Sequence, residues 1–131
     1  DPHTLGYEAC RYLLWVRCTQ ATEAMKAADL LLRDGNLPLV LIDLEWTPRR
    51  ELGRVPSSSW FRLRTLIEKT GATLLVVTPV QLISSAHLRF KLTSTFTVDD
   101  LERPEQILQE SLALSVTRHQ RDRQQSTGTD V

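Results

Sequence analysis

Two short, almost entirely apolar segments constrain the fold of this chain more than any other feature. They are residues 37–44 (LPLVLIDL) and 72–78 (ATLLVVT). Segments of this length and composition are typical of buried strands, and a near-continuous apolar run indicates a strand covered on both faces, as in a parallel sheet. The sequence therefore predicts an α/β domain with a mostly parallel sheet flanked by helices.

A helical pattern precedes each of these segments. Over residues 21–33 the apolar side chains recur at steps of three and four, which predicts an amphipathic helix with Thr19 as its N-cap and Gly35 at its end. A second helix is expected to begin at one of the serines 57–59 and to end at Gly71. Strands that alternate with helices pair in parallel through right-handed crossovers.

Three further segments complete the expected order β-α-β-α-β-β-α. Residues 12–18 (YLLWVRC) are predicted to form a buried strand, residues 87–96 (HLRFKLTSTF) alternate like a strand near the sheet edge, and residues 105–119 are predicted to form a final helix. The expected domain plan is an α/β core over residues 1–98, a C-terminal helix over 99–120 and a flexible tail over 121–131.

Composition narrows the function classes. Lys plus Arg and Asp plus Glu are both 16, so the formal net charge is zero, which argues against a strong non-specific nucleic-acid binder. No apolar run approaches the ~18 residues of a membrane span, so a cytoplasmic protein is expected. Cys10 and Cys18 lack a metal-ligand spacing, and the three histidines are scattered, so neither a metal site nor a catalytic triad is predicted.

The most suggestive polar residues follow the first of the two apolar segments. Asp43 stands at the end of that strand and Glu45 follows two residues later. Ligands sit at the carboxyl ends of strands in open α/β sheets, where an aspartate can help to hold Mg²⁺. The alternative is that Asp43 accepts hydrogen bonds from backbone amides of the next loop. The five glycines form no phosphate-binding loop, so no cofactor is expected from this chain.

The loop over residues 45–56 has a second set of candidate residues: Trp46, Arg49, Arg50 and Arg54. The arginines could contact phosphates while the tryptophan stacks on a base. They could instead pair with Glu45 and Glu51 as an ordinary solvated loop, the interpretation that three loop arginines favour. A third possibility is a contact with a protein partner, since Trp and Arg are the usual anchors of interfaces.

The ordered set of these segments resembles RecA. LLWVRCTQATEAMKAADLLLRDGNLPLVLIDLEWTP resembles the RecA segment that runs through the Walker B strand into the first DNA-binding loop. SSSWFRLRTLIEKTGATLLVVTP resembles the next helix and strand of RecA, and HLRFKLTSTF resembles the strand after those. The resemblance covers about residues 12–96 and implies the second half of a RecA-like core, that is, a truncated P-loop NTPase core that lacks the P-loop. Within that superfamily the chain is most similar to the ImuA family, SulA-like accessory proteins of bacterial translesion synthesis.

The departures from RecA put catalysis in doubt. The resemblance places Asp43 at the Walker B aspartate, but Thr78 and Pro79 stand where RecA has its γ-phosphate-sensing glutamine, and Gln81 comes two positions late. We therefore expect a non-catalytic protein-interaction module of the DNA-damage (SOS) response, bound to translesion polymerase components. The alternatives are a fragment of a genuine RecA-like ATPase whose P-loop precedes residue 1, which would use ATP and Mg²⁺, and a single-stranded DNA-binding module. Self-association is compatible with each.

Overall fold

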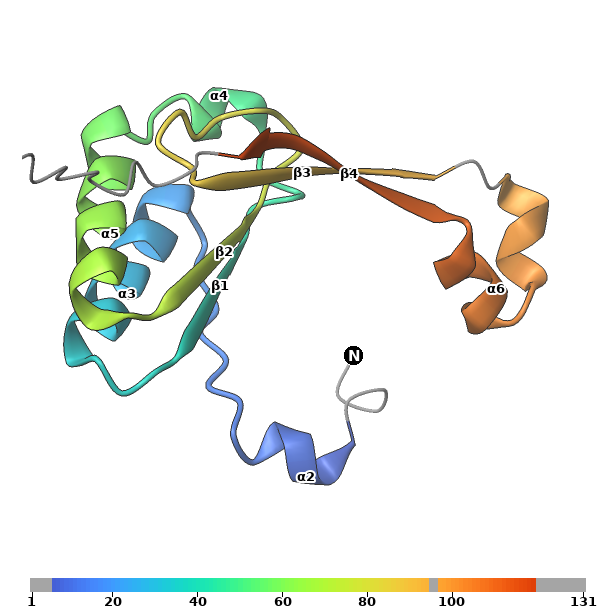
Figure 1. The fold of residues 1–131 in the computed structure, drawn as a ribbon, viewed down its shortest axis with the longest axis horizontal. Coiled ribbons are helices and arrows are strands. Elements are labelled where there is room, and N and C mark those ends of the chain that lie inside the picture. Colours follow the sequence, from blue (N-terminus) through green and yellow to red (C-terminus); the bar gives the residue numbers. More distant parts are fainter. Residues whose placement is uncertain (1–5, 95–96, 120–131) are drawn as a thin grey trace, which may run out of the picture. The chain divides into compact units, whose positions relative to one another are not determined.

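The computed structural model describes residues 6–94 and 97–119, which form two compact units that divide between Ser85 and Ala86. The first contains α2 (Tyr7–Cys10), α3 (Ala21–Asp34), β1 (Leu39–Asp43), α4 (Arg49–Leu52), α5 (Ser57–Thr70) and β2 (Thr73–Val77) (Figure 1). The second contains β3 (Leu88–Ser94), the 3₁₀ helix η1 (Val98–Glu102), α6 (Glu105–Glu110) and β4 (Leu112–His119).

The two long helices form where their apolar periodicity predicts them. The expected helix over residues 21–33 is α3, and Gly35 ends it in the left-handed conformation, with φ of 75°. The N-cap is Gln20 instead of Thr19. Thr19 donates its hydroxyl to the Glu23 carboxylate at 2.8 Å, so it supports the first turn from one residue further out. This hydrogen bond, together with those that the carboxylate accepts from the backbone N–H groups of Thr19 and Gln20, lowers the pKa of Glu23. The helix end at Gly71 is likewise confirmed, with φ of 74°.

Parallel pairing is confirmed for the two apolar segments, which form a two-stranded sheet. β1 and β2 pair in parallel, with Leu39 opposite Thr73 and Asp43 opposite Val77. The helices α3 and α5 lie side by side against this pair (Figure 1). The first unit is therefore a small α/β domain, as the sequence predicts.

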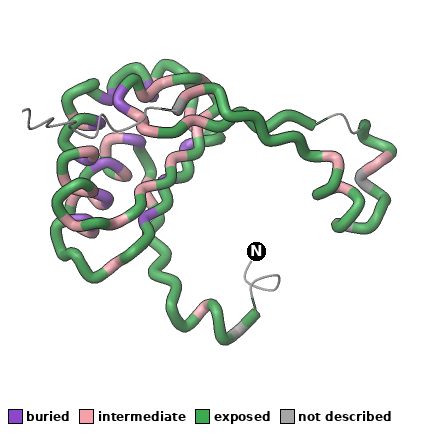
Figure 2. The backbone as a smooth tube through the Cα atoms, viewed as in Figure 1, coloured by how far each residue is buried: buried purple, intermediate pink, exposed green. Residues whose placement is uncertain are grey.

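The core of the first unit lies between the helices and one face of this sheet. Figure 2 shows its buried positions on the helices, on alternate strand residues and in the segment between β1 and α5. Alternation along β1 buries Val40 and Ile42, whereas Leu39 and Leu41 are each 55% exposed. The expectation that the apolar strands are covered on both faces is therefore wrong. In the described part of this unit both helices pack on the same face, and the opposite face remains open.

The buried strand expected over residues 12–18 is also wrong. This segment has no strand pairing, and Trp15 is 73% exposed. The physical reason is partly local. Tyr12 and Leu13 donate their backbone N–H groups to Ala9 and Cys10, at the end of α2, so the first residues of the segment continue a turn. Cys18, which was expected in or beside that strand, is only partly buried.

The second unit differs from the sequence prediction in its last element. A strand is present within residues 87–96 as β3, which runs from Leu88 to Ser94, while residues 95–96 lie outside the described residues. The expectation that it lies near the edge of the parallel sheet is wrong, because β3 belongs to a separate two-stranded sheet. The expected helix over 105–119 ends at Glu110, and residues 112–119 are instead the strand β4, which pairs antiparallel with β3. The alternation of Leu112, Leu114 and Val116 explains the strand, because it has the period of two that suits a sheet. The predicted tail lies in residues that the structure does not describe.

Candidate interaction surface at the carboxyl end of the parallel sheet

The chain leaves β1 through a tight turn at the carboxyl end of the sheet. The Leu44 N–H donates to the Val77 carbonyl at 2.9 Å and so extends the pairing with β2 by one residue. The Asp43 Oδ1 accepts a hydrogen bond from the Glu45 N–H at 3.0 Å. This bond is the one expected if Asp43 organises the following loop. Both carboxylates are exposed to solvent, so they line the rim of the sheet instead of a closed pocket.

The segment after this turn is fixed to the core. Leu52, in α4, is 1% exposed and Val55, just beyond α4, is 6% exposed, so both are buried against the core. The Glu51 carboxylate accepts a hydrogen bond from the backbone N–H of Ala21, the first residue of α3. An anionic side chain is favourable there because the N-terminus of a helix has unpaired N–H groups and a partial positive charge. The position of α4 is therefore set by packing and by a cap.

We call Trp46, Arg49, Arg50 and Arg54 the Trp46–arginine surface. Trp46 is 90% exposed, the highest exposure among the large hydrophobic residues described, and the three arginines are exposed as well. Within residues 6–94 and 97–119, no ion pair involves any of the three arginines. The structure thus does not form the pairs with Glu45 and Glu51 that the solvated-loop interpretation requires. Glu51 is engaged with α3 instead.

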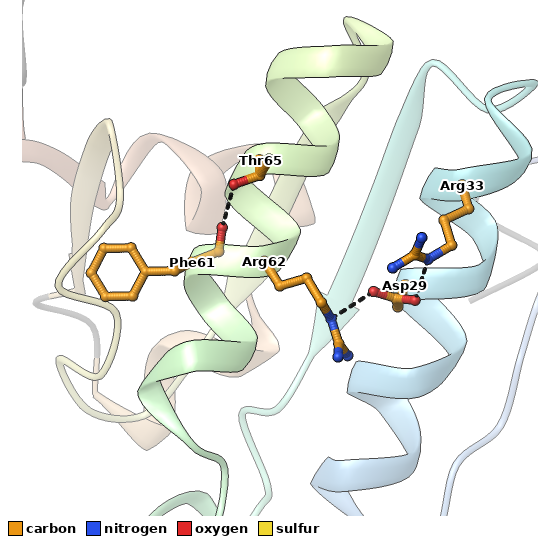
Figure 3. A network of polar contacts seen from close by, with 5 residues as sticks. All are labelled: Asp29, Arg33, Phe61, Arg62 and Thr65. Carbon is orange, nitrogen blue, oxygen red and sulfur yellow. Dashed lines mark hydrogen bonds and ion pairs between the residues drawn. The ribbon is translucent and has the colours of Figure 1, made fainter.

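A separate charged cluster joins the two long helices (Figure 3). The Asp29 carboxylate in α3 accepts a hydrogen bond from the Arg33 Nε on Oδ2, at 2.7 Å. Its other oxygen, Oδ1, lies 2.8 Å from the Nε of Arg62 in α5. The hydrogen bond from Arg33 lowers the pKa of Asp29, and the charge of Arg62 lowers it further. Arg62 and Asp29 lie on different helices, so sequence periodicity does not reveal this ion pair, which joins α5 to α3.

The residues after β2 form a short turn. Thr78 donates its hydroxyl to the Val80 carbonyl at 2.8 Å, and Gln81 is exposed. Trp60, at the start of α5, is buried with its indole N–H lacking a hydrogen-bond partner in the described structure. In the described residues, no hydrogen bond or ion pair links Thr78, Gln81 or Trp60 to the Trp46–arginine surface.

The structure defines the class of the first unit, and the comparisons with known proteins add nothing to it. Among the residues described, no three His, Cys, Asp or Glu side chains gather as metal ligands. No helix in the same residues has the length and apolarity to cross a membrane. Comparisons with family models, curated proteins and solved structures give no match. The first unit therefore stands as a small α/β domain with a two-stranded parallel sheet.

Proposed function

We propose that this chain is a non-catalytic interaction module that binds a protein partner through its Trp46–arginine surface. The observation that carries the proposal is a tryptophan that is 90% exposed, followed within eight residues by three exposed arginines. Leaving a large aromatic side chain in water forfeits the free energy of burying it, and Trp and Arg are the residue types most enriched at the energetic centres of protein interfaces.

The fixed position of this surface supports the same function. A partner that binds a flexible loop must also offset the entropy of ordering it. Here Leu52 and Val55 anchor the segment to the core, and Glu51 ties it to α3. The segment is therefore ordered when the chain folds, and most of the entropy cost of ordering it does not fall on binding.

The charge of the surroundings favours a protein over a nucleic acid. Asp43 and Glu45 are exposed only a few residues before the arginines, and the whole chain has a net charge of zero. A polyanion would be repelled by these carboxylates, whereas a protein surface of mixed charge could complement both sets. The resemblance to RecA and to the ImuA family suggests the partner class, a translesion polymerase subunit. The missing phosphate-binding loop supports a role without catalysis.

The test is a binding titration of the full chain against a purified Y-family-like polymerase subunit. We expect Trp46→Ala, and separately a double Arg49→Ala, Arg50→Ala variant, to weaken binding by about tenfold or more, as interface anchors do. Trp15→Ala is the matched control, because Trp15 is also exposed, at 73%, but lies outside the surface. Equal affinities for the Trp46 and Trp15 variants would contradict the proposal.

Two further titrations test the competing functions. The first titration uses single-stranded DNA. If the chain binds this DNA and Trp46→Ala abolishes the binding, the surface is a nucleic-acid site. Calorimetric titration with ATP and Mg²⁺ tests the ATPase alternative, with Asp43→Ala as the variant. Nucleotide binding that disappears in this variant would show a working nucleotide site and would overturn the non-catalytic function.

A further inference from the structure

Two arginines lie together on the outer side of α4 and the turn that follows it. Leu52 is buried, so its side of the helix faces the core. At about 100° per residue, Arg50 and Arg54 lie roughly opposite Leu52. The turn continues beyond α4, because Arg54 donates its backbone N–H to the Glu51 carbonyl at 2.9 Å. The two arginines are therefore neighbours, and both are exposed.

These neighbouring cations have no counter-charge in the part of the chain that the structure describes. Arg49, Arg50 and Arg54 form no ion pair there. Glu51, the acidic residue between them in sequence, accepts the Ala21 N–H instead. Like charges four residues apart on a helical turn repel each other. Carboxylates placed over the arginines would remove this repulsion and would add charge-assisted hydrogen bonds to the guanidinium groups.

The indole of Trp46 adds an apolar requirement to this charge. Trp46 is 90% exposed and stands four residues before Arg50. A ligand that has only charge, such as a free phosphate ion, would leave the indole in water. A segment with an apolar side chain beside its acidic ones would bury the ring and pair the arginines at once.

We propose that the part of the partner that occupies the Trp46–arginine surface is a short acidic peptide segment. Its Asp or Glu side chains pair with Arg50 and Arg54, and an apolar side chain next to them packs on Trp46. The guanidinium group suits this role, because its planar fork binds a carboxylate through two parallel hydrogen bonds. This partner class rests on the proposed function, since it gives the chemistry of the segment that binds the same surface.

The negative charge at the start of the same segment favours an acidic peptide over a nucleic acid. Asp43 and Glu45 are exposed just before Trp46. A nucleic acid has a phosphate at every nucleotide, so a strand laid along this segment would bring phosphates near these carboxylates. The charge of a peptide can end at the arginines. Because the pairs are exposed, salt screens them, and the affinity should fall several-fold between about 50 mM and about 500 mM NaCl.

The experiment is fluorescence anisotropy of a labelled synthetic peptide, in which glutamates flank a central leucine, titrated with the full chain. Glutamine in place of every glutamate should weaken binding to the wild-type chain by about tenfold or more, and so should the double variant Arg50→Ala, Arg54→Ala. The matched control is Arg11→Ala, Arg17→Ala, which removes the same charge outside the surface and should stay within about twofold of wild type. Alanine in place of the leucine should weaken binding to the wild-type chain but not to Trp46→Ala.

Three outcomes would overturn the acidic segment. They are no binding of the peptide up to about 1 mM, equal binding of the glutamate and glutamine peptides, and equal losses in the two double arginine variants. The glutamine comparison uses the wild-type chain alone, so it decides the charge requirement even if a variant fails to fold.

Competition separates this inference from the proposed function. The peptide should displace the polymerase subunit from the chain. A subunit that binds through Trp46 but is not displaced would refute the acidic segment and leave the proposed function standing. A peptide that binds as expected while the subunit does not bind would support the acidic segment and refute the polymerase subunit as the partner. Single-stranded DNA that displaces the peptide at lower concentration than the unlabelled peptide does would make the surface a nucleic-acid site and overturn both.

Discussion

Two leucines of α3 provide a direct test of the core. Leu32 is 1% exposed and is among the most completely buried side chains, whereas Leu30, two residues earlier on the same helix, is 68% exposed. Replacing either by alanine leaves the helix propensity almost unchanged, because both residues are strong helix formers. The two variants therefore differ only in how much side-chain packing they remove. The difference between their free energies of unfolding measures the contribution of Leu32 to the core.

The expected cost of Leu32→Ala follows from its burial. Three carbon groups at about 0.8 kcal/mol each give about 2.4 kcal/mol of lost transfer free energy, and the cavity left behind raises the total to about 3–4 kcal/mol. Leu30→Ala should change the free energy of unfolding by no more than about 0.5 kcal/mol. For a domain whose whole stability is about 5–15 kcal/mol, the first change is a large fraction and the second is negligible.

Urea unfolding of the full chain measures both values. The denaturation midpoint of Leu32→Ala should fall by about 2 M, given a slope of about 1.5 kcal/mol/M for a small domain, while the midpoint of Leu30→Ala should stay within the error of the wild-type value. Circular dichroism follows the helices in both variants. Equal losses in the two variants would refute the packing of α3 against the sheet through the face that contains Leu32.

Three further predictions address the helices and the first segment. Asp29→Asn should lower the free energy of unfolding by about 1 kcal/mol near neutral pH, discounted for the exposure of its arginine partners. Because folding lowers the pKa of Asp29, its contribution is present above the unfolded pKa of about 3.9 and is lost as pH falls through the lower folded value, so urea unfolding near pH 2 should show no difference. Gly35→Ala should lower the free energy of unfolding, measured by thermal unfolding, by about 1 kcal/mol. The cost comes from the backbone alone, because φ is 75° there while no atom lies within 4 Å of the added carbon. Gly53→Ala, at φ of −64°, should have no such cost. In hydrogen exchange, the amides of residues 14–18 should exchange without protection while the β1 amides that pair with β2 are protected, and slow exchange in 14–18 would contradict the exposed segment.

The parts of the fold that the sequence predicted are those whose signal lies within one element. The apolar period of α3 and the glycine at its end are local signals, and the helix and its end lie where these signals predict them. In β1 the residue composition predicted the strand but not its exposure. Whether Leu39 and Leu41 are covered depends on which face the helices pack against, and that choice is made by contacts distant in sequence.

The predictions that proved wrong concern segments whose local pattern fits both a helix and a strand. The apolar residues of 105–119 suited an irregular helical stripe, but Leu112, Leu114 and Val116 fit a period of two better, and pairing with β3 made the strand stable. In the candidate site, the exposure of Trp46 follows no sequence rule, and the partner of Glu51 lies 30 residues away along the chain. Sequence reasoning therefore named the residues of the surface but could not establish how the segment is held.

The hydrogen bond between Glu51 and Ala21 couples the surface to the first turn of α3. Unravelling that turn moves the amide away from Glu51, and displacing Glu51 exposes the amide to water. A ligand that binds only the ordered segment would therefore also suppress opening at the start of α3, through mass action on the same equilibrium. The exchange rate of one backbone amide, that of Ala21, would report occupancy of a site on another element.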